Sequence, residues 1–82
     1  MIREKIIICN KTIDTTSVAE LIKIATKYDG SIWIEKDDHR VNAKSLLGVL
    51  YLNIKNGTEI RLIADGADAE MAITDTCMFL ER

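Results

Sequence analysis

The sequence predicts an α+β protein in which helices cover one face of an antiparallel sheet, an arrangement known as an open-faced sandwich. Two hydrophobic periodicities alternate along the 82 residues: a repeat of two, typical of strands, and a repeat of about 3.6, typical of helices. The dipeptides Asp29-Gly30, Asn56-Gly57 and Asp65-Gly66 separate these segments, because such pairs readily form turns. We expect the order β-α-β-β-α-β-α in a single domain over residues 1–82.

The first elements are expected to be a strand and an amphipathic helix. Residues 2–9 alternate and then run apolar, with the even-numbered side chains from Ile2 to Ile8 on one face, which is typical of a strand. Residues 17–28 carry apolar side chains at i, i+3, i+4 and i+7, so they predict a helix. The pattern Ser17-Val18-Ala19-Glu20 at its start resembles a capping box.

The middle of the chain predicts a hairpin and then a short helix. Strands at 31–36 and 40–43 flank the polar turn Asp37-Asp38-His39, and Ser45 precedes an apolar helix at 46–52. A helix that is apolar nearly all round must be buried or must contact a partner.

The last elements predicted are an alternating strand at 58–64 and a C-terminal helix from Ala69 to Leu80. Each strand has one apolar face, which needs cover on that face only. We therefore expect a four-stranded antiparallel sheet covered on one face by three helices.

Composition limits the classes of function. The net charge is −2, with 13 acidic and 11 basic side chains, which argues against nucleic acid as the main ligand. No apolar run approaches the ~20 residues of a membrane span, and the charged first residues do not resemble a signal peptide. Cys9 and Cys77 lie in apolar surroundings and are interpreted as buried thiols. These features predict a cytoplasmic protein that binds no membrane.

Common catalytic motifs are missing from the sequence. The single histidine, His39, lies in a charged turn, and there is no glycine-rich phosphate loop, CxxC or HExxH. We expect no enzymatic activity, no cofactor and no metal site.

Residues 36–50 resemble the central signature of HPr, the histidine-containing phosphocarrier of the sugar phosphotransferase system. The most specific part is Val41-Asn42-Ala43-Lys44-Ser45, followed by a small apolar helix with an internal glycine. Segments 25–29, 56–60 and 64–68 agree with the family in order and spacing, so the resemblance covers nearly the whole chain. It implies an HPr-like fold.

The active-site loop departs from the family pattern. The resemblance places Asp14 at the position of the phosphorylated histidine, Thr16 at that of the arginine and Ser17 at that of the proline. Phosphohistidine chemistry needs an imidazole nucleophile and groups that hold the phosphoryl oxygens, whereas Asp14 and Glu20 would both repel phosphate. Two interpretations of Asp14 stay open: a carboxylate that caps the helix, and an acceptor that forms an aspartyl phosphate.

Ser45 occupies the position of the family's regulatory serine, which HPr kinase phosphorylates. A hydroxyl in the first turn of a helix is also a natural N-cap, so Ser45 could serve the helix alone. The resemblance further implies a partner-binding site formed by Leu46, Leu47 and Leu50 together with Lys44 and Arg40.

These features predict a regulatory HPr-like protein, similar to the paralogue Crh in lacking the histidine and keeping the serine. Its expected partners are a transcription regulator, HPr kinase or a phosphotransferase component. A phosphocarrier that uses Asp14 and a binding module outside the phosphotransferase system are the alternatives. We expect a monomer, or a homodimer formed by exchange of the first strand.

Overall fold

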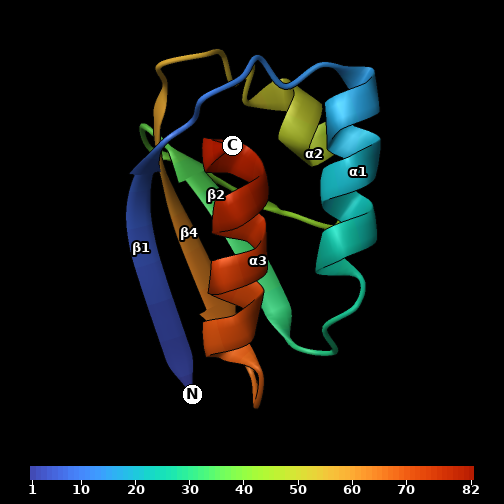
Figure 1. Ribbon diagram of the computed structural model, residues 1–82, viewed down its shortest axis with the longest axis vertical. Helices are drawn as coiled ribbons and strands as arrows, with labels where there is room; N and C mark the ends of the chain where they lie inside the picture. The colour runs from blue at the N-terminus through green and yellow to red at the C-terminus, as the bar shows by residue number, and fades with distance from the viewer.

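The computed structural model describes residues 1–82 and confirms the predicted order of elements. The elements are β1 (Ile2–Ile8), α1 (Thr15–Ala25), β2 (Ser31–Lys36), β3 (His39–Asn42), α2 (Leu46–Tyr51), β4 (Glu59–Asp65) and α3 (Ala69–Glu81). All strand pairs are antiparallel and the sheet order is β1-β4-β2-β3. In Figure 1 the helix α3 lies in front of β1 and β4, with α1 and α2 beside it.

A single core fills the space between the sheet and the helices. Its largest fully buried aliphatic side chains come from every layer: Val18, Leu21, Ile32, Ile34, Val49, Ile54, Ile60, Leu62 and Leu80. Cys9 and Cys77 are buried and not disulfide-bonded, as predicted. The longest helix, α3, has 13 residues, and none of the helices has the length and apolar character that crossing a bilayer requires.

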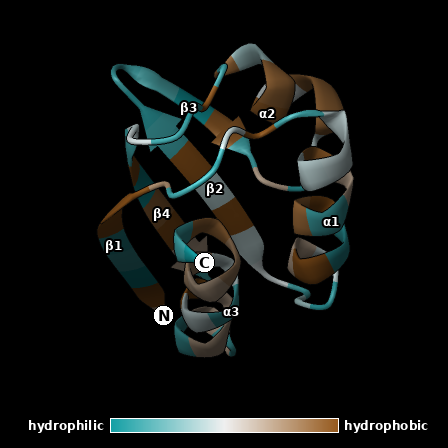
Figure 2. Cartoon of the chain, turned by 45° about the horizontal axis from the view of Figure 1, so that its top comes forward, coloured by the Kyte–Doolittle hydropathy of each residue, from teal (hydrophilic) through white to brown (hydrophobic).

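Strand β1 turns most of its isoleucines away from this core. Ile7 is buried, whereas Ile2, Ile6 and Ile8 are 60%, 54% and 52% exposed. In Figure 2 the strand is hydrophilic in its charged middle and hydrophobic at both ends. The even-numbered face identified from the sequence is therefore the face opposite the helices.

Helix α1 is shifted relative to the sequence prediction. It begins at Thr15 instead of Ser17 and ends at Ala25 instead of residue 28. The predicted capping box at Ser17 was wrong, because Asp14 is the N-cap residue and the backbone N–H of Ser17 donates to its carboxylate. Aspartate is one of the most favourable N-caps. Glu20 consequently lies in the second turn and does not face the helix start with Asp14.

Candidate functional site

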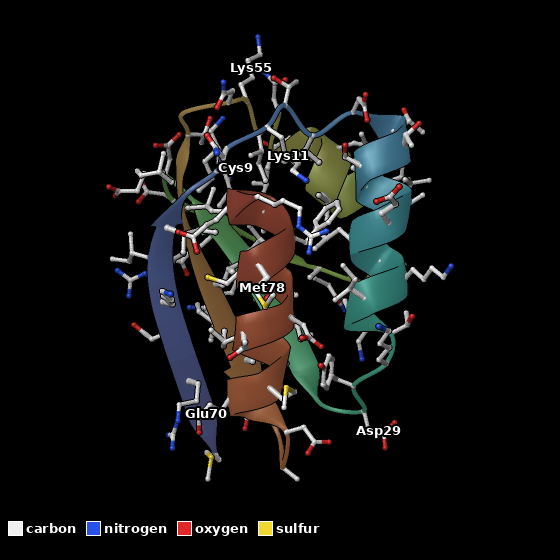
Figure 3. All side chains as sticks on the ribbon, in the orientation of Figure 1. Cys9, Lys11, Asp29, Lys55, Glu70 and Met78 are labelled. Atoms are coloured by element: carbon white, nitrogen blue, oxygen red, sulfur yellow. The ribbon has the colours of Figure 1, made fainter.

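The segment after β1 crosses the end of the sheet to reach α1, and the loop after α2 holds it in place. The backbone N–H of Ile13 donates to the carbonyl of Ile54 at 2.9 Å, and Ile13 is buried. The hydroxyl of Thr12 accepts from the backbone N–H of Asn56 at 3.4 Å. In Figure 3 both Lys11 and Lys55 lie at this end of the molecule. The position of Asp14 is thus fixed by a loop that is distant in sequence.

The carboxylate of Asp14 is exposed and serves the helix that follows. Its Oδ1 accepts from the backbone N–H of Ser17 at 2.9 Å. This hydrogen bond, with a further one from the Ser17 side chain, lowers the pKa of Asp14 below its ordinary value. Asp14 forms no ion pair in the structure. The arrangement favours an ionised cap and provides no cation that would hold a phosphoryl group.

The side chains next to Asp14 do not replace the family's arginine. Thr16 is exposed, but its short side chain carries no positive charge that could pair with a phosphoryl group. The ammonium of Lys11 lies 4.0 Å from the centre of the Phe79 ring, a cation–π contact that occupies it. A phosphate at Asp14 would therefore meet a carboxylate with no bound counter-charge.

Ser45 caps α2 in the same way that Asp14 caps α1. It has extended backbone angles, φ −103° and ψ 116°, and its Oγ accepts from the backbone N–H of Gly48 at 3.1 Å. A Cβ added at Gly48 would lie 3.2 Å from this Oγ and 3.2 Å from the Cβ of Val41. Gly48 thus leaves the space in which the half-buried hydroxyl sits against the helix start.

The outer side of α2 carries an apolar surface, which we call the α2 patch: Leu46, Leu47 and Tyr51. They are 44%, 78% and 66% exposed, whereas Leu50 is half-buried and packs against the core. Sequence reasoning missed Tyr51, although its position one turn after Leu47 could have indicated it. The Tyr51 ring makes an edge contact with His39, with centroids 5.4 Å apart.

The two basic residues expected at the partner-binding site are paired with other groups of the chain. The ammonium of Lys44 donates to the carbonyls of Tyr28 and Gly30 at 2.6 and 2.9 Å, so it holds the loop between α1 and β2. Arg40 donates from Nε to Glu35 at 2.9 Å and lies over the Trp33 ring. Glu35 and Trp33 alternate along β2 with the buried Ile34, which places Arg40 on the sheet face opposite α2.

The chain matches a family model over residues 2–82, and the model is described as the PTS HPr component phosphorylation site. The sequence is 30% identical to the HPr-like protein Crh of Bacillus subtilis, over 100% of this chain and 98% of that protein. It is 35% identical to the phosphocarrier protein HPr of Neisseria meningitidis, over 92% of this chain and 89% of that protein.

Solved structures agree with this match. A phosphocarrier HPr from Bacillus anthracis superposes with a TM-score of 0.92 at 28% identity, over 96% of both chains. Crh of Bacillus subtilis superposes with a TM-score of 0.80 at 30% identity, over 87% of this chain and 82% of that one. The crystal structure of that Crh was described as an intertwined, domain-swapped dimer.

Proposed function

The chain belongs to the HPr family of the phosphotransferase system, and from that premise we propose that it is a regulatory member that has lost the phosphorelay step. It acts in the cytoplasm by docking to other proteins through the α2 patch, and phosphorylation of Ser45 gates this docking. It catalyses no reaction of its own. The partners are a transcription regulator, HPr kinase or a component of the phosphotransferase system.

The observation that carries this proposal is the role of Asp14 as the N-cap of α1. At the family's phosphohistidine position stands a carboxylate with a lowered pKa that caps α1 and pairs with no cation. An incoming phosphoryl group would approach this carboxylate at an exposed helix start, where no paired cation offsets the repulsion between the two negative groups. Carboxylates that accept phosphate elsewhere need a group that offsets this charge.

Ser45 is supported as the regulatory residue by its position. Its hydroxyl lies at the start of α2, directly before Leu46 and Leu47, and a phosphate there adds about −1.5 to −2 charges. The added charge would stand beside the most exposed leucine of the chain, Leu47. A partner that buries this leucine in an apolar pocket would be disfavoured, and one that offers arginine or lysine near the phosphate would be favoured.

Lys44 and Arg40 take different parts in this proposal. Lys44 positions the α2 start by anchoring it to the loop carbonyls of Tyr28 and Gly30, while the patch itself makes the contact. Arg40 can reach only a partner that extends around β3, because its guanidinium is paired with Glu35 on the other sheet face.

Two phosphorylation assays test the proposal. With HPr kinase and ATP we expect one phosphate on Ser45, absent from Ser45→Ala and unchanged in Ser31→Ala, an exposed serine outside the site. With enzyme I and phosphoenolpyruvate we expect no label. An acid-stable, hydroxylamine-sensitive label on Asp14 would identify a phosphocarrier instead. No label in either assay would indicate a binding module outside the phosphotransferase system.

Docking through the α2 patch is tested with the same kinase. Leu47→Ala is expected to lower kcat/KM for phosphorylation of Ser45, because the kinase loses an exposed apolar contact next to its target. Met78→Ala is the matched control, since Met78 is 57% exposed on α3 and points away from the sheet in Figure 3. Equal rates for the two variants would contradict docking at α2.

A further inference from the structure

The sheet face opposite the helices carries apolar side chains that the core does not use. The exposed isoleucines of β1 lie on this face, and Glu4 between them pairs in register with Ile63 of β4. Ile63 in turn pairs with Trp33 of β2. Ile63 is only 5% exposed yet lies outside the core cluster, because its neighbours on the open face cover it. An aromatic and aliphatic strip therefore runs across a face that no helix covers.

A connected series of ion pairs crosses the same face. Glu4 of β1 pairs with Arg61 of β4 at 2.7 Å, and Arg61 lies 3.7 Å from Glu35 of β2. Glu35 pairs with Arg40 of β3 at 2.8 Å. In register, one row across the sheet reads Ile6, Arg61, Glu35 and Arg40, and Glu4 lies in the next row beside Ile63.

We propose that this open face binds a second copy of the chain, face to face, about a two-fold axis that runs along the strands between β4 and β2. Such a rotation reverses the order of the strands. In the row that contains Arg61 and Glu35, Arg61 faces Glu35 of the second copy, and Ile6 faces its Arg40. In the adjacent row Ile63 faces Trp33 of the second copy. The two pairs on the central strands, Arg61 with Glu35 and Ile63 with Trp33, thus select a second copy as the occupant, because an unrelated surface would have to match both rows at once.

The resulting dimer is a sandwich of two sheets about 10 Å apart, with the helices of each copy on the outside. Each copy keeps its own β1, which distinguishes this dimer from one formed by strand exchange. The starts of α1 and α2 stay free, so the inference does not depend on the proposed function. The molecule measures 30 × 23 × 21 Å, so the face supplies at most a standard-sized interface, and we expect a dissociation constant of roughly micromolar or weaker.

The chain contains its own reporter, because Trp33 is its only tryptophan and lies at the centre of the face. Sedimentation equilibrium and tryptophan fluorescence are measured together from about 1 µM to about 1 mM, which brackets the expected dissociation constant. We expect a monomer–dimer equilibrium with a blue shift of the emission over the same concentration range. A monomer at the highest concentration, with unshifted emission, would overturn the proposal.

Matched variants locate the interface. Ile6→Lys introduces a positive charge opposite Arg40 of the second copy and is expected to raise the dissociation constant at least about tenfold, a change of about 1.4 kcal/mol. Leu47→Lys, on the α2 patch, is the control and is expected to leave it unchanged. Both side chains are more than half exposed, and circular dichroism verifies that both variants fold. Equal effects of the two variants would place the contact elsewhere.

Charge exchange tests the register. Arg61→Glu is expected to weaken the dimer, and the double change Arg61→Glu with Glu35→Arg to restore it, because the row remains complementary to its own reversal. Failure of the double variant to recover would contradict the two-fold arrangement. A dimer whose copies exchange only after unfolding would show strand exchange and would also overturn the proposal.

Discussion

The starts of α1 and α2 share one local design but differ in chemistry. Each helix is preceded by an extended residue whose side-chain oxygen accepts from the backbone N–H three residues later, Asp14 from Ser17 at 2.9 Å and Ser45 from Gly48 at 3.1 Å. The first oxygen belongs to an exposed carboxylate, and the second to a half-buried hydroxyl. Capping requires only an acceptor of the right reach, so the fold tolerates either group.

The proposed loss of the relay step requires no change in the fold. Asp14 satisfies the helix start as well as many other residues would, while a phosphoryl carrier needs a specific nucleophile and a cation beside it. Ser45 keeps both capacities, because a hydroxyl can cap a helix and can be phosphorylated. At Ser45 one hydroxyl can therefore both cap the helix and accept a phosphate. At Asp14 the side chain meets only the need for a cap.

The largest expected effect comes from restoring the family's histidine and arginine at the start of α1. Asp14→His together with Thr16→Arg is expected to gain an acid-labile phosphoryl label from enzyme I and phosphoenolpyruvate. The single variant Asp14→His should be labelled about 100-fold more slowly, the typical loss when one charge-stabilising donor is missing. Thr16→Arg alone is the control and should stay unlabelled. Absence of label on the double variant would show that more than these two positions has been lost.

The order of elements and the division of each strand into two faces were predictable, because each depends on local patterns. Alternation in residues 58–64 correctly assigned Ile60 and Leu62 to the face opposite Glu59. The start of α1 was not predicted, since Asp14 and Ser17 are both good N-caps. Only the burial of Val18, Leu21 and Ala25 in the core and the anchoring of Ile13 decide between them.

Two features of the functional surfaces depend on tertiary structure and have no local signal. Alternation shows that the residues of β1 have two faces but not which one the helices cover, and here the face with more isoleucines stays exposed. Lys44 reads as a free charge in the sequence, yet its ammonium binds carbonyls 14 and 16 residues away. Such long-range hydrogen bonds also explain why a basic residue next to Ser45 is not part of the α2 patch.

The next largest effect tests whether the start of α2, unlike the start of α1, depends on the hydrogen bonds of the Lys44 ammonium. Lys44→Met removes two charged hydrogen bonds to carbonyls and is expected to lower the free energy of unfolding by about 2 kcal/mol. Lys55→Met is the matched control, because Lys55 is exposed and its ammonium makes no hydrogen bond. Urea denaturation measures both. Equal stability of the two variants would mean that the Lys44 contacts contribute nothing in solution.

Removing the Ser45 cap of α2 should lower the free energy of unfolding by a smaller amount. Ser45→Ala loses the acceptor for the N–H of Gly48, and we expect a loss of about 1 kcal/mol, typical of N-cap deletions. For a domain of this size that corresponds to a lower Tm by about 4–8 °C. Thr16→Ala, an exposed change in the first turn of α1 without a lost cap, serves as the control. A Tm for Ser45→Ala equal to that of Thr16→Ala would show that Ser45 is dispensable for α2.

The smallest effect separates the two caps by their response to pH. Because the pKa of Asp14 is lowered in the folded protein, its contribution to stability is present above its ordinary value of 3.8 and is lost as the pH falls through the folded-state value. The stability difference between the wild type and Asp14→Asn should therefore narrow as the pH falls below that ordinary value. The difference between the wild type and Ser45→Ala should stay constant, since a hydroxyl does not titrate there. An Asp14 pKa at or above its ordinary value, measured by NMR titration, would mean that the carboxylate does not cap α1 in solution, and the comparison between the two starts would fail.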